Sequence, residues 1–368
     1  MSRYLRIPLL VLALILIGGA ILFLQRTSST PEEATVGQED SDTPALIGLA
    51  DWINSEPVTL RSLQGKVVLL DFWTYTCINC LRTVPYLQGW YEAYADDGLV
   101  ILGIHSPEFN FEKKLENVGM AVADLGVTWP VALDNDRATW RAFKVRGWPT
   151  KIILDREGNV QFQQAGEGGY SAWEERIRSL LAEGVPELEL AEAPALEEPD
   201  FGQYQGITRE IYGGFFRRPV FGLQPYIGNP EGYREEAHEY TDSLGKVTGS
   251  FYLHGLWRSE AESIIHARDS EGYEDYISTL YFAGEVNTVI RPLSDDPIQI
   301  RVTLDEMPVP EEARGADVYW DEDAQWTFLT VKEPRMYRLI DEAQRDIHEL
   351  RLYPSTATFA LHAYTFGP

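Results

Sequence analysis

Cysteine and basic side chains are both scarce in this chain. Only two of its 368 residues are cysteine, which excludes a scaffold held by several disulfides and a zinc site of four thiolates. Lysine and arginine number 31 against 57 aspartate and glutamate, a formal net charge of −26. We therefore predict no nucleic-acid partner, because binding phosphates requires a basic face. A polybasic membrane surface is excluded on the same ground.

One long uncharged run lies at the N-terminus. Residues 7–25 carry no charge, between Arg6 and Arg26. As a helix rising about 1.5 Å per residue, this run would span roughly 28 Å, close to the hydrocarbon thickness of a bilayer. The arginines before it predict a cytoplasmic N-terminus and an extracytoplasmic remainder. We predict a single-pass transmembrane signal anchor over 1–26, with a cleaved signal peptide as the alternative.

The rest of the chain divides into segments that differ in composition and hydrophobic pattern. Residues 27–44 are too polar to pack and predict a disordered tether. Over 45–183 strand-like runs alternate with helical periodicity, which predicts an α/β layer fold whose mainly parallel sheet ends in a hairpin. The acidic, proline-containing stretch 184–200 predicts a linker. Short aromatic and β-branched runs over 201–368 predict an antiparallel β-sandwich or jelly roll.

The first of these two domains can be divided further into elements. Strands are expected over 66–73, 99–104, 151–154 and 160–164, and helices over 78–94, 109–125, 134–143 and 171–181. Ser171 is the expected N-cap of the last helix, with Glu174 completing a capping box. In the second domain we expect strands within 249–257, 276–283, 286–290 and 298–304.

The two cysteines form a Cys77-Ile-Asn-Cys80 motif. Cys77 follows a buried strand at the point where a helix begins, and the amides and dipole at a helix N-terminus stabilise a thiolate. Cys80 lies one turn further into the helix and can attack a mixed disulfide made by Cys77. Half of a zinc site, a structural disulfide and an inactive remnant are the alternatives. No further zinc ligands lie nearby in the sequence, and a disulfide here would close too small a loop to restrict the unfolded chain much.

The motif and its surroundings resemble the thioredoxin superfamily. The resemblance is carried by the segment from Lys66 through Cys80, by Pro85, and by Gly147-Trp-Pro-Thr150. Within the superfamily the chain is similar to the membrane-tethered, extracytoplasmic TlpA/DipZ type. The resemblance is strong over 45–183. It is looser over 201–368, where DipZ-type proteins also carry a β-rich domain.

The resemblance implies roles for individual residues. Asp71, in an apolar strand, matches the buried acid that takes the proton of the second cysteine, and burial of a carboxyl raises its pKa toward a useful range. Pro149 matches a cis-proline beside the disulfide that helps seat the substrate. Its neighbour Trp148 and Thr76, the residue before the motif, are the other expected substrate contacts.

Further positions are weaker candidates. Glu108 matches an acid near the disulfide and is expected to move protons, whereas His105 beside it is more typical of a packed strand end. Pro85 matches the proline that bends the active-site helix. The chain departs from most thioredoxins in having Thr76 before the motif and Ile78-Asn79 within it. Because these residues tune the redox potential, the direction of electron flow does not carry over.

The resulting prediction is an enzyme, a thiol-disulfide oxidoreductase without metal or cofactor, acting on disulfide-containing or dithiol proteins. A separate membrane reductase or oxidant would reset its disulfide. A peroxidase is one alternative: Thr74 is spaced correctly before Cys77, but Leu70 stands where that chemistry needs proline. Another alternative is a glycan- or protein-binding role for the β domain, through an aromatic platform of Tyr252, Trp257, Trp320 and Trp326.

Overall fold

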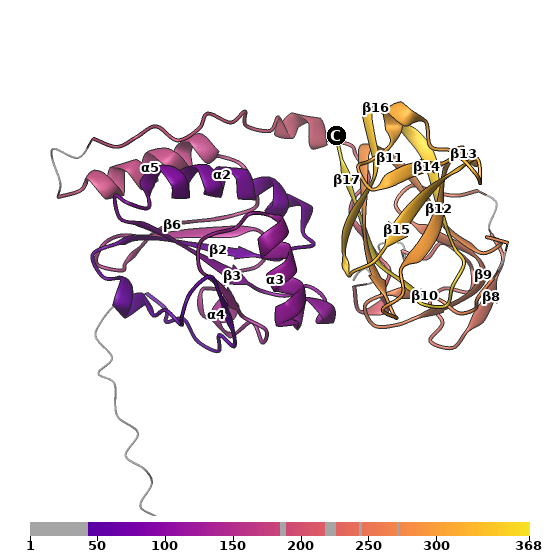
Figure 1. Ribbon diagram of the computed structural model, residues 1–368, viewed down its shortest axis with the longest axis horizontal. Helices are drawn as coiled ribbons and strands as arrows, with labels where there is room; N and C mark the ends of the chain where they lie inside the picture. Colours follow the sequence, from indigo (N-terminus) through magenta and orange to yellow (C-terminus); the bar gives the residue numbers. More distant parts are fainter. Residues whose placement is uncertain (1–42, 185–188, 218–225, 243–244, 271) are drawn as a thin grey trace, which may run out of the picture. The chain divides into compact units, whose positions relative to one another are not determined.

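The computed structural model describes residues 43–184, 189–217, 226–242, 245–270 and 272–368. Figure 1 shows an α/β part followed along the chain by an all-β part. The predicted anchor, 1–26, lies outside the described residues, as does most of the tether. Within the described ranges, no helix is both long enough and apolar enough to cross a bilayer.

The α/β part has a six-stranded sheet in the order β1-β4-β3-β2-β5-β6. Its centre is parallel and its β5–β6 edge antiparallel, as the hairpin signal predicted. The strands are β1 Trp52–Ile53, β2 Val67–Trp73, β3 Leu99–His105, β4 Val131–Leu133, β5 Thr150–Leu154 and β6 Val160–Ala165. The α-helices are α2 Ile78–Tyr94, α3 Leu115–Asp124, α4 Ala138–Ala142 and α5 Tyr170–Ala182, and single 3₁₀ turns are η2 Leu60–Leu63 and η3 Asn110–Lys113.

Strand β2 is buried on both faces, and its side chains point alternately into two hydrophobic cores, one on each side of the sheet. Leu69 and Trp73 belong to the core that also holds side chains of α2, α3 and α5. Leu70 and Phe72 belong to the core on the α4 side. Successive strand residues face opposite sides, so Asp71 lies on the same face as Leu69, beneath α2.

Three helix boundaries differ from those predicted. The expected helix over 109–125 is η3 and α3, interrupted at Lys114, whose ψ of 121° is extended. Helix α4 begins late because the Asp134 carboxylate accepts from the amides of Thr139 and Trp140. The capping box at Ser171 is wrong: α5 begins at Tyr170 after Gly169, whose φ is 64°.

The C-terminal part is all-β, as predicted, and its strands join into one eleven-stranded sheet. The predicted strands over 276–283 and 286–290 form a single strand, β11, with register shifts near Gly284. Its first half pairs with β9 and its second half with β17. The strands are β7 Ile211–Tyr212, β8 His238–Tyr240, β9 Phe251–Ser259, β10 Ile264–His266, β11 Tyr276–Pro292, β12 Ile298–Leu304, β13 Met307–Pro308, β14 Val318–Asp321, β15 Trp326–Val331, β16 Arg335–Pro354 and β17 Phe359–Gly367.

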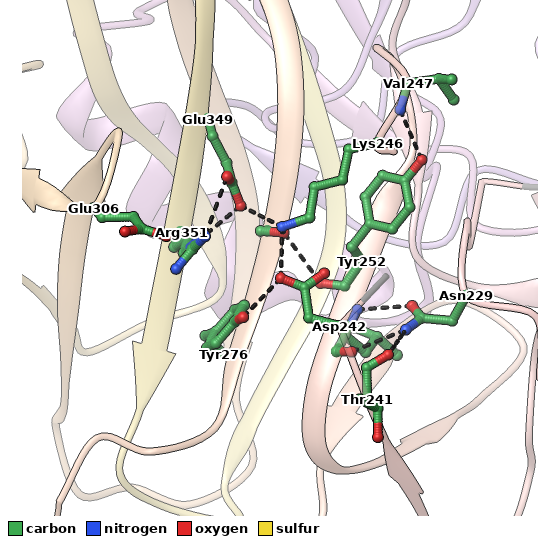
Figure 2. A network of polar contacts seen from close by, with 12 residues as sticks. Asn229, Thr241, Asp242, Lys246, Val247, Tyr252, Tyr276, Glu306, Glu349 and Arg351 are labelled. Carbon is green, nitrogen blue, oxygen red and sulfur yellow. Dashed lines mark hydrogen bonds and ion pairs between the residues drawn. The ribbon is translucent and has the colours of Figure 1, made fainter. Parts of the chain in front are cut away.

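A polar network fixes the segment before β9 against β11 and β16 (Figure 2). Lys246 Nζ contacts Asp242 Oδ2 at 2.7 Å and Glu349 Oε1 at 2.5 Å. The Tyr276 hydroxyl donates to Asp242 and the Arg351 guanidinium donates to Glu349. Each of the four charged side chains is mostly buried, so each charge depends on its partners.

Two of the four aromatic residues predicted to form a platform are core residues. Trp257 is fully buried, with its indole N–H bonded to the His254 carbonyl. Tyr252 is buried, and its hydroxyl accepts from the Val247 amide. Neither ring presents a face to a ligand, so a platform of all four residues does not form.

Candidate active site

The 74–77 turn carries the first cysteine to the start of α2. The Cys77 amide donates to the Thr74 carbonyl at 3.3 Å, and Cys77 is the N-cap of the helix. Its Sγ accepts from the Cys80 amide at 3.3 Å. A thiolate at this position is stabilised by that amide and by the helix dipole.

Cys80 is shielded, whereas Cys77 is half-buried. The Cys80 side chain is 2% exposed. Burial raises the pKa of its thiol, and the neighbouring Cys77 raises it further. Cys77 is therefore the more accessible of the two sulfurs, and Cys80 is the one whose thiolate is disfavoured by burial.

Asp71 is buried on the α2 side of the sheet, 4% exposed. Burial raises the pKa of its carboxyl to about 7, and the positive charge of Lys151 opposes that rise. Among the described residues, Oδ1 of Asp71 has no hydrogen-bond partner. A carboxyl that is neutral or charged with little bias near pH 7 can accept a proton from Cys80.

Lys151 is a site residue that the sequence analysis missed. It is the register partner of Asp71 across β2 and β5, and it is fully buried. Burial lowers the pKa of its amine, whereas Asp71 and Cys80 raise it. The sequence did contain a signal for it. Lys151 and Ile153 point to the same face of their strand, and Ile153 belongs to the core on the α2 side, so a lysine at 151 had to be buried.

His105 is the last residue of β3, and Glu108 lies in the loop that follows it. The Glu108 carboxylate accepts from the Tyr212 hydroxyl at 3.1 Å. His105 is fully buried, and burial lowers its pKa to about 3. Its Nε2 lies 3.3 Å from the Thr74 hydroxyl. A neutral, enclosed imidazole packs the strand end and does not exchange protons near pH 7.

The predicted substrate contacts lie in two environments. The Trp148–Pro149 peptide bond is cis, which confirms that expectation, and the Trp148 indole donates to the Ser106 carbonyl at 2.9 Å. Thr76 is buried instead, 2% exposed, and its hydroxyl donates to Glu112 Oε1. The Thr76 side chain is therefore not available to a substrate.

A cleft of about 820 Å³ opens beside Cys77. Its wall on the α/β side includes Trp148, Glu108 and Glu167. Residues from β7, from the segment before it and from β17 also line it: Tyr204, Gly206, Ile207, Thr208, Arg209, Glu210, Tyr212, Thr365 and Phe366. No local pattern predicted these, because only the folded chain brings them near residue 77.

Comparisons with known proteins agree with this architecture. The AhpC/TSA family model matches residues 47–163, and a model described as a thioredoxin-like C-terminal domain matches 208–367. Thiol-disulfide oxidoreductase YkuV of Bacillus subtilis is 27% identical over 140 residues, which cover 38% of this chain and 94% of YkuV. Thiol-disulfide oxidoreductase ResA of Bacillus thuringiensis is 28% identical over 159 residues, which cover 43% of this chain and 86% of ResA. The chain thus carries an AhpC/TSA-type domain followed by a thioredoxin-like C-terminal domain, and it is similar to thiol-disulfide oxidoreductases.

A further relative narrows that class. Protein DipZ of Mycobacterium tuberculosis is 36% identical over 250 residues, which cover 67% of this chain and 34% of DipZ. This similarity, together with the two matched family models, agrees with the resemblance to DipZ-type thioredoxin-like proteins expected from the motif. The chain spans about a third of the length of this curated relative.

Proposed function

We propose that this chain is a thiol-disulfide oxidoreductase that acts on protein disulfides through Cys77 and Cys80. The observation that carries the proposal is the pairing of a half-buried Cys77, capping α2 beside an open cleft, with a buried Cys80 behind it. This asymmetry separates an attacking sulfur from a resolving one.

The exchange has two steps. The Cys77 thiolate attacks one sulfur of the substrate disulfide; that S–S bond breaks, a Cys77–substrate disulfide forms, and the first substrate thiolate leaves and takes a proton. Asp71 then accepts the Cys80 proton, and the Cys80 thiolate attacks Cys77 Sγ. The mixed disulfide breaks and the second substrate sulfur leaves as a thiolate, which takes up a proton, so two electrons and two protons reach the substrate.

Each turnover leaves a Cys77–Cys80 disulfide, which a separate dithiol donor must reduce. We assign that role to a membrane thiol reductase, with residues 1–26 as the anchor that holds the chain at an extracytoplasmic membrane face. The reverse cycle, with a separate oxidant, uses the same two sulfurs. The reduction potential decides the direction: a value near −270 mV, about that of thioredoxin, indicates a reductase, and one near −120 mV, about that of DsbA, an oxidant.

Reduction of insulin disulfides by the purified full chain tests the activity. We expect turnover by the wild type and none by Cys77→Ser, while Cys80→Ser accumulates the mixed disulfide. Alkylation of the reduced protein with iodoacetamide should label Cys77 ahead of Cys80. Labelling in the reverse order would exchange the two roles.

Peroxide consumption measured in parallel tests the alternative of a thiol peroxidase. The Thr74 hydroxyl, which that chemistry would need open to peroxide, is fully buried against His105. We therefore expect peroxide consumption no faster than that of a free thiol. Peroxide turnover that exceeds insulin reduction would reject the exchange reaction as the main activity.

A further inference from the structure

Glu112 is a buried carboxylate that the exchange mechanism leaves unused. It lies in η3, and its side chain is fully buried. The Thr76 hydroxyl donates to Oε1 at 2.5 Å. The amides of Glu108 and Phe109 donate to Oε2 at 2.5 Å and 2.9 Å. One side chain thus joins the residue before the nucleophile to the loop that carries Glu108.

The contact with Thr76 reaches the nucleophile through a short path. Thr76 is adjacent to Cys77 in the 74–77 turn, which closes through the hydrogen bond from the Cys77 amide to the Thr74 carbonyl. Thr74, at the other end of the turn, is held by His105. Any change in the bond between Thr76 and Glu112 therefore acts on the backbone that places the Cys77 sulfur.

Protonation of Glu112 must alter that bond in a defined way. Oε2 faces two N–H donors, so an added proton resides on Oε1, toward Thr76. The Thr76 hydroxyl, a donor to the carboxylate, then becomes an acceptor from the carboxylic acid. A single proton reverses the hydrogen bond on which the turn rests.

The surroundings of Glu112 put this change near neutral pH. Burial raises the pKa of Glu112 to about 7, the negative charge of Glu108 adds to the rise, and bonds from Thr76, Phe109 and Thr74 oppose it. Tyr75 is a further titratable group on which the charge of Glu112 acts, and His105 stacks on the Tyr75 ring. Burial raises the pKa of Tyr75 and lowers that of His105, so both rings stay neutral near pH 7.

We propose that Glu112 is a positioning residue for Cys77, which holds the 74–77 turn through Thr76 and gives the reactivity of Cys77 a second pH-dependent step. The inference rests on the proposed function, in which Cys77 is the attacking sulfur. Glu112 is fully buried and acts on Cys77 through the 74–77 turn, chiefly through Thr76. Sequence analysis missed it because the three residues between Glu108 and Glu112 gave no sign of which acid is buried.

The test is the rate of Cys77 alkylation by iodoacetamide in the full chain from pH 5 to pH 9, with the adduct located by mass spectrometry. We expect the wild-type profile to require two ionisations. If ionisation of Glu112 shifts that of Cys77 by about one pK unit, the second step changes the alkylation rate about tenfold. In Glu112→Gln the amide oxygen still accepts both N–H groups and its NH₂ donates to Thr76, so the bridge persists without a titrating proton and one ionisation remains.

Two further variants separate positioning from charge. Thr76→Val keeps the Glu112 charge but removes the bridge, so it should also leave one ionisation; a surviving second step would mean that Glu112 acts through space, and would overturn the proposal. Glu116→Gln, an exposed glutamate on α3, is the matched control and should keep both steps. If Glu112→Gln does not fold, as judged by near-ultraviolet circular dichroism, Thr76→Val decides.

The outcomes also distinguish this inference from the proposed function. A Cys77 that reacts readily but retains two ionisations in Glu112→Gln contradicts the positioning role alone. If alkylation does not label Cys77 ahead of Cys80, the exchange mechanism itself is contradicted.

Discussion

At the scale of single residues, the chemistry depends on charges placed where they are least stable. Asp71 and Lys151 are register partners on neighbouring strands, both buried beneath α2. Burial pushes the pKa of the acid up and that of the amine down, and each charge partly offsets the shift of the other. We expect the acid of this pair to take the Cys80 proton, because neither of its own charge states is strongly favoured near pH 7.

Replacement of Asp71 by asparagine should slow resolution but not attack. Asp71→Asn removes the group that accepts the Cys80 proton, and such proton transfer is worth roughly 10²–10⁴-fold in rate. We expect the mixed disulfide with a model substrate to form at a near-normal rate and to decay that much more slowly. Asp124→Asn, an exposed acid at the end of α3, is the control. Wild-type decay in Asp71→Asn would make this acid structural.

The same variant should change the pH dependence of stability. The pKa of Asp71 is raised in the folded state from 3.8 to about 7, so its stabilising contribution is present below pH 3.8 and is lost as pH rises through 7. Relative to the wild type, Asp71→Asn should gain about 4 kcal/mol of unfolding free energy between pH 4 and pH 8. Urea titrations at both pH values measure this gain. A constant difference between the two proteins would refute the buried titration.

At the scale of elements, the sequence predicted those whose signals are local. The apolar run of β2, the helical period of α2 and the hairpin of β5 and β6 each needed only neighbouring residues. The break between η3 and α3 was missed although its cause is local, because hydrophobic spacing does not show when a side chain bonds back to the backbone. Glu112 bonds back to Glu108 and Phe109, which shapes a 3₁₀ turn where helical spacing alone predicted a continuous helix.

The candidate site divides in the same way. Cys77, Cys80 and Asp71 follow from one strand and the helix after it, so the motif sufficed to find them. Lys151 and Glu112 come from elements that only tertiary packing brings to β2 and α2. The C-terminal wall of the cleft depends on contacts across more than a hundred residues, which periodicity does not encode.

The network around Lys246 yields a prediction for the β domain. Lys246→Met leaves the carboxylates of Asp242 and Glu349 mostly buried without their shared cation. Hydrogen bonds to charged groups contribute about 2 kcal/mol each, so we expect a loss of about 2–4 kcal/mol in unfolding free energy. Lys332→Met, at an exposed position, should change it by less than about 0.5 kcal/mol. Equal denaturant midpoints for the two variants would show that the network adds no stability.

At the scale of the whole molecule, buried histidines should limit stability in acid. Burial lowers the pKa of both His105 and His362 to about 3. A lowered folded-state pKa gives stability that is present above pH 6.5 and is lost as pH falls toward 3. His362, on β17, packs edge-on against Phe109 and Phe111 with centroids 4.9 Å apart in each case.

Removal of one of these titrations should be measurable. Relative to the wild type, His362→Gln should gain about 1.4 kcal/mol of unfolding free energy for each pH unit below 6.5, or about 3 kcal/mol by pH 4.5. Thermal or urea unfolding at pH 6.5 and pH 4.5 gives the comparison, with His238→Gln on half-buried β8 as the control. A loss that is the same at both pH values would assign His362 to packing alone.

The position of β17 in the sheet sets the order in which the β domain can fold. Residues 359–367 pair with β11, β10 and β7, which come from earlier and well-separated parts of the chain. During synthesis, β10 and the second half of β11 must wait with unpaired edges until this strand is available. Sheets closed by such distant pairings fold slowly and expose strand edges in the meantime. When a ribosome is stalled before residue 359, the β domain should therefore still be sensitive to protease, while the α/β domain, which is synthesised earlier, is already resistant.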